Sequence, residues 1–328
     1  MSSAGVGRVN ASTNGLLSPR PVISVVIPVR NEGQRLHAAV SSIVSGRSDR
    51  FPLQIVLVDD GSSDGCCNGQ SEAWSWYDDL VRVDVVHLPR WSGIPFARNA
   101  GAGAAHAPIL FITDANVLFP QNWDLPIRER ITANRVLCAT IADLDSPFRG
   151  YGCTLLIPSM GVDWIRDPRQ YGGYVPIAPC SGTAITADLF RRAGGYDTEM
   201  PVYGAAEPEF SVRLWLCGAE IVSIPDLVLH HHFRPAAERQ PFLDAINKVL
   251  LRNYLRFGLL YLDQQRIAQL MHYYSEQSPS HFAEALRSLS ADDVWRRRRL
   301  LEERLPSRFP SFVERFGIRD AFGQLAYS

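Results

Sequence analysis

The sequence predicts an α/β protein with a mostly parallel central sheet flanked by helices, followed by a helical C-terminal extension. Two observations lead to this fold class. Apolar runs of strand length alternate with segments of helical periodicity over roughly residues 22–113, and such alternation favours parallel strands joined by right-handed crossovers. Beyond Pro241 the apolar residues recur mainly at helical spacing.

In chain order, the first elements are apolar runs rich in Val, Ile, Leu or Phe, which we interpret as buried strands. The segments between them place apolar residues at helical spacing, and the last of these segments is rich in Ala and Gly. The strands are expected at residues 22–28, 53–58, 81–88 and 109–113, and the helices at residues 36–44, 70–80 and 95–107.

The rest of the chain has a more mixed pattern. Residues 160–178 combine Gly, Pro, Tyr and Trp, which predicts a loop over a cleft. Short apolar runs predict strands at residues 136–142, 151–157, 220–224 and 226–229. Helical spacing predicts helices at residues 187–193, 208–217, 242–257, 259–274 and 281–303, the last with a break.

The composition is that of a folded globular chain. Of the 328 residues, 46% are hydrophobic and 20% are charged, which suits one large or two modest domains. The net charge of -1 offers no basic field, so no nucleic-acid partner is expected. The six cysteines lack paired CxxC spacing, and we interpret them as reduced thiols of a cytoplasmic protein.

Three segments outside the predicted sheet complete the organisation. Residues 1–20 are rich in Ser, Gly and Asn and lack an apolar core of signal-peptide length, so a disordered N-terminus is expected. No apolar run of about 18 residues predicts a transmembrane helix. Trp295 precedes four arginines with acidic neighbours, which we interpret as a solvated helix face, with peripheral contact to anionic lipid as the alternative.

The most informative motif is Asp114-Ala115-Asn116, which closes the apolar run 109–113. A carboxylate and an amide oxygen thus lie at the carboxyl end of a strand, where α/β sheets bind ligands. Side-chain oxygens two residues apart can face one hard cation, and such a cation usually bridges phosphate oxygens. The alternative is a plain exit from strand to turn, because Asp and Asn are common turn residues.

Two neighbouring strand ends also carry polar side chains. Asp60 opens a Gly-Ser turn, and its carboxylate can accept hydrogen bonds from a base N–H or a ribose hydroxyl; capping of a helix is the alternative. Pro28 and Arg30 end the first strand in a similar way, which makes a nucleotide pocket plausible. Arg98, on the Ala/Gly-rich helix, can pair with a carboxylate or a diphosphate, or be solvated.

Two further candidates lie in the second half of the chain. Glu207 is at the start of a predicted helix, where the dipole favours an ionised carboxylate that can act as a general base or as a helix cap. In the extended run 230–232, alternation places His231 on the opposite face from its two histidine neighbours. One imidazole could complete a metal shell begun by Asp114, and imidazole favours Mn²⁺ over Mg²⁺.

In order and spacing, these residues resemble family 2 glycosyltransferases of the GT-A fold, which is Rossmann-like, over about residues 22–235. The resemblance implies that Pro28, Arg30 and Asp60 surround the base and ribose of a nucleotide sugar. Residues 97–101 are similar to the A-R-N-x-G helix of the family, which adds Arg98 to the donor site. Residues 114–116 stand in place of its DxD metal motif, so that Asp114 contacts both metal and donor.

Residues 194–215 resemble a segment shared by galactosyl- and polypeptide N-acetylgalactosaminyl-transferases. The resemblance implies that Glu207 occupies the position of the acidic base and that His231 ligates manganese. Two departures stand out: Asn116 replaces the second acidic metal ligand or a histidine, and Ala206 replaces a glutamate. A base is required if the enzyme inverts the anomeric centre, whereas in a retaining enzyme Glu207 would orient donor or acceptor.

The expected function is therefore metal-dependent transfer of a sugar from a nucleotide-diphosphate sugar, expected to be a UDP-sugar, to an unidentified acceptor. The metal is expected to be Mn²⁺, or Mg²⁺, bound by Asp114, Asn116 and His231. A catalytically decayed nucleotide-sugar-binding protein is the alternative, suggested by the two departures. A nucleotidyltransferase ranks last because the first strand is followed by one glycine, Gly33, rather than a Gly-rich loop. Residues 21–235 are assigned to the GT-A domain and residues 236–328 to the helical extension.

Overall fold

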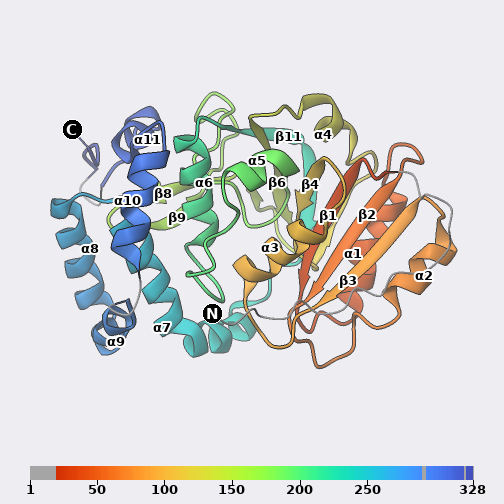
Figure 1. Cartoon of the computed structure of the whole chain (residues 1–328), viewed down its shortest axis with the longest axis horizontal. Helices are drawn as coiled ribbons and strands as arrows, with labels where there is room; N and C mark the ends of the chain where they lie inside the picture. Colours follow the sequence, from red (N-terminus) through yellow and green to blue (C-terminus); the bar gives the residue numbers. More distant parts are fainter. Residues whose placement is uncertain (1–19, 290–292, 321–322, 328) are drawn as a thin grey trace.

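The computed structural model describes residues 20–289, 293–320 and 323–327. The expected disordered N-terminus, residues 1–20, lies outside this part of the chain except for Arg20. The chain forms a curled central sheet with helices on both sides and a group of helices at the C-terminal end (Figure 1). The predicted α/β fold class is therefore confirmed.

The main sheet has the strand order β3-β2-β1-β4-β10-β6-β11-β5, with β7 paired to β6. Its strands are β1 (Ile23–Val29), β2 (Leu53–Asp59), β3 (Val81–His87), β4 (Ile109–Ile112), β5 (Val117–Leu118), β6 (Arg135–Asp143), β7 (Arg149–Gly150), β10 (Thr183–Thr186) and β11 (Glu220–His231). Two more strands, β8 (Cys153–Leu156) and β9 (Gly161–Trp164), form a separate antiparallel pair.

The first four strands form the parallel half of the sheet that the sequence predicts. β1 pairs in parallel with β2 and β4, and β2 with β3. Their carboxyl ends therefore meet at one edge. β10 then runs antiparallel between β4 and β6, whereas β6 and β11 are again parallel. Because β10 is inserted in this way, the carboxyl ends of β6 and β11 lie at the same edge as those of β1 to β4.

The helices are α1 (Gln34–Ser45), α2 (Gln70–Tyr77), α3 (Ile94–Ala104), α4 (Leu125–Arg130), α5 (Ala187–Arg192), α6 (Ala206–Leu216), α7 (Ala236–Tyr261), α8 (Gln264–Gln277), α9 (Pro279–Leu289), α10 (Val294–Arg304) and α11 (Phe309–Arg315). α1 and α3 cover opposite faces of the parallel half. Ile23 and Val25 of β1 share one core with α1, and Val26 points to the other face, against α3. A Cβ added at Gly101 would lie 2.4 Å from Val26 Cγ1, so this glycine allows α3 to approach the sheet closely.

The C-terminal helices pack on the sheet through a shared core. Leu255 and Phe257 of α7 belong to the same buried cluster as Val26 and Leu110. α7 begins at residue 236 rather than at the predicted 242, and Pro241 lies inside it. The first turns of α7 around Pro241 are exposed, and the buried residues of the helix begin at Ile246. The proline therefore interrupts the hydrogen-bond ladder before the packed part of the helix begins.

Several elements differ from the sequence prediction. β5, β7, β10, α4 and α11 were not predicted, and β9 lies within the predicted loop 160–178. The predicted strands 220–224 and 226–229 form one continuous strand, β11, with an irregularity in its pairing to β6. The four residues of β10 carry too short an apolar signal to be recognised from periodicity; their pairing with β4 and β6 defines them as a strand.

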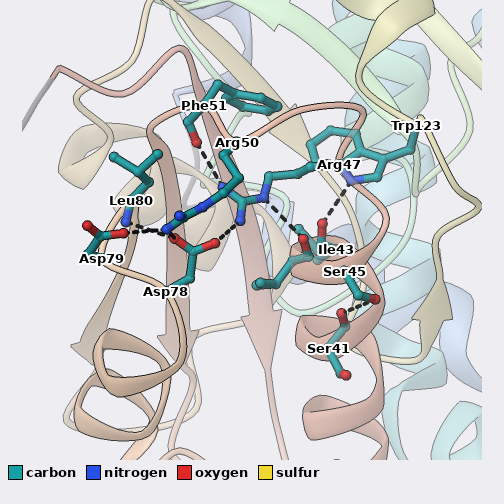
Figure 2. Close-up of polar contacts among 11 residues, drawn as sticks. Ser41, Ile43, Ser45, Arg47, Arg50, Phe51, Asp78, Asp79, Leu80 and Trp123 are labelled. Carbon is teal, nitrogen blue, oxygen red and sulfur yellow. Dashed lines mark hydrogen bonds and ion pairs between the residues drawn. The ribbon is translucent and has the colours of Figure 1, made fainter.

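Hydrogen bonds at the amino ends of the strands hold α1 against the sheet (Figure 2). The indole N–H of Trp123, which is fully buried, donates to the Ile43 carbonyl at 2.9 Å. Arg47 donates to the Phe51 carbonyl at 2.8 Å and pairs with Asp78. These contacts precede β2 and β3, so they lie at the sheet edge opposite to Asp60 and Asp114.

The arginine run of the C-terminal region lies on α10. Arg296 pairs with Asp293 at 2.5 Å and Arg298 pairs with Glu302 at 2.9 Å. Arg298 also donates to the Leu259 and Leu262 carbonyls and thereby satisfies the C-terminal end of α7. Among the described residues, every helix is too short or too polar to cross a bilayer.

Candidate functional site

A buried arginine joins the two candidate carboxylates. Arg98, only 1% exposed, donates through Nη1 to Glu207 Oε1 at 2.7 Å and through Nη2 to Asp114 Oδ1 at 3.1 Å. Burial alone would lower the pKa of this guanidinium, but Tyr196, Glu207 and Asp114 outweigh burial and raise it. Arg98 is therefore a permanent cation that orients both carboxylates.

Asp114 is placed by the pairing of β4 with β10. The N–H of Asp114 donates to Ser181 Oγ at 3.1 Å, and Ser181 is in turn hydrogen-bonded to Thr113 Oγ1 at 2.9 Å. The neighbouring Cys180 carbonyl accepts a hydrogen bond from Arg98. The sequence does not reveal the role of this segment, because only the antiparallel β10 brings residues 180–181 beside the end of β4.

Glu207 is the second residue of α6, as the predicted helix start requires. Its carboxylate meets Asp114 only through Arg98, whose guanidinium carbon lies 5.5 Å from the centre of the Tyr196 ring. Asn99 fixes this tyrosine by accepting from its N–H at 2.9 Å and donating to its carbonyl at 2.8 Å. In the A-R-N motif, Arg98 thus contacts the two carboxylates, and Asn99 holds the chain that leads to Glu207.

The end of β11 places His231 opposite Asp114. His231 Nε2 lies 3.9 Å from Asp114 Oδ2, whereas His230 is exposed and His232 Nδ1 lies 3.7 Å from Asp145. The strand alternation inferred from the sequence therefore separates the three rings. Burial lowers the pKa of His231, with Asp114 acting in the opposite direction, so the imidazole is neutral at pH 7 and can donate a lone pair to a metal.

The residues at this edge fit a divalent metal in part. Asp114 and His231 offer an oxygen and a nitrogen donor, a mixed set that suits Mn²⁺. Asn116 Nδ2 donates to the His232 carbonyl at 2.9 Å, which leaves the amide oxygen as the atom it can offer. Within the described ranges, no group of three or more His, Cys, Asp or Glu side chains could hold a metal. A cation here needs further ligands from a bound molecule.

The predicted nucleotide residues gather at the ends of β1 and β2. Pro28 is buried within β1. Asp60, 3% exposed, accepts from the backbone N–H groups of Ser92 at 2.6 Å and Gly93 at 2.8 Å. Burial raises the pKa of Asp60, and these hydrogen bonds oppose the rise. Arg30 donates to the Asp60 carbonyl at 2.8 Å.

Trp91 adds an aromatic surface beside these residues. Its ring lies 4.7 Å from the Arg30 guanidinium carbon and is 39% exposed. It directly precedes the backbone that holds Asp60. A lone tryptophan after a predicted strand carries no signal for such a role, so sequence reasoning did not identify it.

A second ion pair at the same edge was also not predicted. Arg234, just beyond β11, donates to Glu32 Oε1 at 2.7 Å and thereby links the end of β11 to the loop after β1. Burial raises the pKa of Glu32, with Arg234 acting in the opposite direction and Asp114 adding to the rise. The edge therefore carries one more partly buried carboxylate besides Asp60, Asp114 and Glu207.

The family profile described as "Glycosyl transferase family 2" matches residues 24–190. The chain belongs to glycosyl transferase family 2. This confirms the resemblance drawn from residues 22–235. The sequence is also similar to N-acetylgalactosaminyltransferase 6 of Drosophila melanogaster, at 27% identity over an alignment of 269 residues; the match covers 75% of this chain and 39% of that protein. The chain spans less than half the length of the curated relatives it matches.

Solved structures show that this family 2 chain has the GT-A fold. The crystal structure of GalNAc-T7 with UDP, GalNAc and Mn²⁺ covers 90% of the chain with a TM-score of 0.69 at 22% identity, and the match spans 56% of that protein. The mannosyltransferase PcManGT from Pyrobaculum calidifontis, in complex with GDP-Man and Mn²⁺, covers 87% with a TM-score of 0.55 at 18% identity, spanning 79% of it. These structures show the fold, and the family 2 match shows the glycosyltransferase domain.

Proposed function

We propose that this family 2 chain transfers a sugar from a nucleotide-diphosphate sugar, specifically a UDP-sugar, to an acceptor hydroxyl or thiol in the presence of Mn²⁺. One arrangement carries the proposal: Arg98 holds Asp114 and Glu207 at the edge where His231 faces Asp114. Similarity to named N-acetylgalactosaminyltransferases supports the transferred sugar being a hexose or N-acetylhexosamine.

Each residue at the edge has a separate role in the proposal. Pro28, Arg30 and Asp60 surround the base and ribose. Asp114 and His231, with the amide oxygen of Asn116, hold the cation, and the diphosphate of the donor completes its ligands. When bound, Mn²⁺ supplies positive charge that stabilises the leaving diphosphate.

Glu207 acts on the acceptor side. If the product is inverted, Glu207 takes the proton of the attacking acceptor group while the bond to the diphosphate breaks. If the anomeric configuration is retained, Glu207 orients donor or acceptor. The guanidinium of Arg98 is bonded to Glu207, Asp114 and the Cys180 carbonyl, so we assign it to the carboxylates, with its effect on the donor passing through Asp114.

A nucleotide-sugar screen by thermal shift, with and without Mn²⁺, tests the proposal. A donor at one hundred times its dissociation constant adds about 2.7 kcal/mol of stability, and we expect this only for UDP-sugars with Mn²⁺ present. Hydrolysis or transfer of the same donor is then measured. Binding without either reaction would favour the alternative of a catalytically decayed nucleotide-sugar-binding protein, and no binding at all would contradict both.

Three further assignments stay predictions. The division into residues 21–235 and 236–328 awaits expression of the two parts. The cytoplasmic location rests on the six cysteines, all of which are free thiols. The acceptor is a glycan, a peptide or a small molecule.

A further inference from the structure

The segment that leads into Glu207 has an unusual backbone. Val202, Gly204 and Ala205 have φ values of 66°, 81° and 64°, all in the left-handed region. That region is rare for residues other than glycine and is strained for a β-branched valine. Such conformations persist only where the surroundings hold them. The contacts that hold this segment therefore maintain a strained backbone next to Glu207.

One side of the segment is held by the turn that binds Asp60. The Ile94 N–H donates to the Val202 carbonyl at 3.0 Å. A Cβ added at Gly93 would lie 2.2 Å from Val202 backbone atoms, so only glycine permits this approach. Because the Gly93 N–H also donates to Asp60, the same turn contacts the nucleotide carboxylate and the Glu207 segment.

The other side is held by Asn253 of α7, a helix that packs against α6 (Figure 1). Asn253 is fully buried, and its Nδ2 donates to the Pro201 carbonyl at 2.8 Å and the Tyr203 carbonyl at 2.9 Å. Its Oδ1 has no hydrogen-bond partner within the described part of the chain. A flipped amide would set Oδ1 against these carbonyls, so the donors must face the segment. Nδ2 also lies 3.5 Å from the Gly204 carbonyl, so the polar side chain is accounted for by its bonds to residues 201, 203 and 204.

We propose that Asn253 is a positioning residue for Glu207, an inference that rests on the proposed function. The Ala206 N–H donates to the Gly204 carbonyl at 2.9 Å, so the conformation of the segment sets where α6 begins. Glu207 is the next residue and must reach Arg98. Asn253 therefore fixes the carboxylate from outside the sheet, without contacting substrate.

The test compares Asn253→Leu with Trp123→Phe. Leucine keeps the size of the side chain and removes both donors. Trp123→Phe removes a buried side chain-to-carbonyl bond of similar length, to Ile43, at the opposite sheet edge (Figure 2). We expect Asn253→Leu to lower kcat at least tenfold with the donor KM changed less than twofold. Trp123→Phe is expected to lower the melting temperature with unchanged kcat.

Rescue separates positioning from general destabilisation. Asparagine tolerates the left-handed region better than valine, so Val202→Asn in the Asn253→Leu background should restore at least threefold of the lost kcat. If Asn253→Leu does not fold, Asn253→Ser, which keeps one donor, takes its place. An Asn253 variant with wild-type kcat, or loss of kcat of equal size in Trp123→Phe, would overturn the proposal.

Amide hydrogen exchange gives a readout that needs no activity. The Ile94 and Ala206 amides, both bonded to the segment, should exchange at least tenfold faster in the Asn253 variant and unchanged in Trp123→Phe. If the wild-type chain transfers no sugar while these amides respond as expected, the proposed function fails and the anchoring by Asn253 stands. Unchanged exchange would overturn the anchoring whatever the activity.

Discussion

The two carboxylates joined by Arg98 are placed in different ways. Asp114 follows β4, and the register of β4 with β1 and β10 sets its position at the edge. Glu207 follows a segment with left-handed residues, held by Ile94 and Asn253 from distant parts of the chain. One side of the site is built by a continuous ladder, and the other by a few individual contacts.

Because of this difference, substitutions on the two sides should affect the site in different ways. A substitution at the edge of the parallel half removes a ligand or a charge but leaves the ladder intact. A substitution around the Glu207 segment can move a carboxylate without removing it.

Asp114→Ala should abolish transfer and leave the fold intact, because the donor side loses the carboxylate that faces His231, while Arg98 keeps Glu207 as a partner. Initial rates with donor and Mn²⁺ and the melting temperature are the measurements. Asp145→Ala, at an exposed carboxylate near His232, is the matched control and should remain active. Turnover near that of the wild type in Asp114→Ala would contradict the assignment of Asp114 as a metal ligand.

Glu207→Gln should lower kcat by about a hundredfold to ten-thousandfold if the carboxylate is a general base. The amide keeps the shape of the side chain and removes its basicity, so the dissociation constant of the donor should hardly change. Steady-state kinetics and the anomeric configuration of the product are measured together. A retained configuration with only a small loss of kcat would reject the base role and leave Glu207 as an orienting residue.

His231→Ala should weaken the apparent affinity for Mn²⁺ in donor binding by about tenfold or more, because only this histidine of the three faces Asp114. His230→Ala and His232→Ala are the controls, and both should titrate with Mn²⁺ like the wild type. The measurement is donor affinity across a series of Mn²⁺ concentrations. Equal effects at the three positions, or the largest effect at His232, would show that a different histidine is the ligand.

Glu32→Gln should have the smallest effect, a rise in melting temperature at pH 7 on the order of 1 °C. Burial raises the pKa of this carboxyl in the folded state above its ordinary 4.5. The native carboxylate therefore costs stability once the pH exceeds the folded pKa, and the cost disappears below the unfolded pKa. Melting curves from pH 4 to 8 should show the advantage of glutamine shrinking as the pH falls. An advantage that grows on acidification would contradict the raised pKa.

Much of the candidate donor side of the site could be predicted from the sequence. Apolar runs with polar ends located β1, β2 and β4, strand alternation placed His231 on the opposite face from its two histidine neighbours, and the family resemblance implied that it is the ligand. It did not reveal β10, whose four residues become a strand only by pairing with β4 and β6. Nor did it reveal the contact of Arg98 with the Cys180 carbonyl, which depends on that pairing.

By itself, the sequence determined the α/β class, the parallel half and the candidate side chains, because periodicity and turn residues act over a few neighbouring positions. Only the tertiary structure decided that Arg98 contacts both Asp114 and Glu207, and that Asn253 of α7 holds the segment that precedes Glu207. These contacts join residues far apart in the chain. Their geometry follows from how buried layers pack, and no local pattern in the sequence records it.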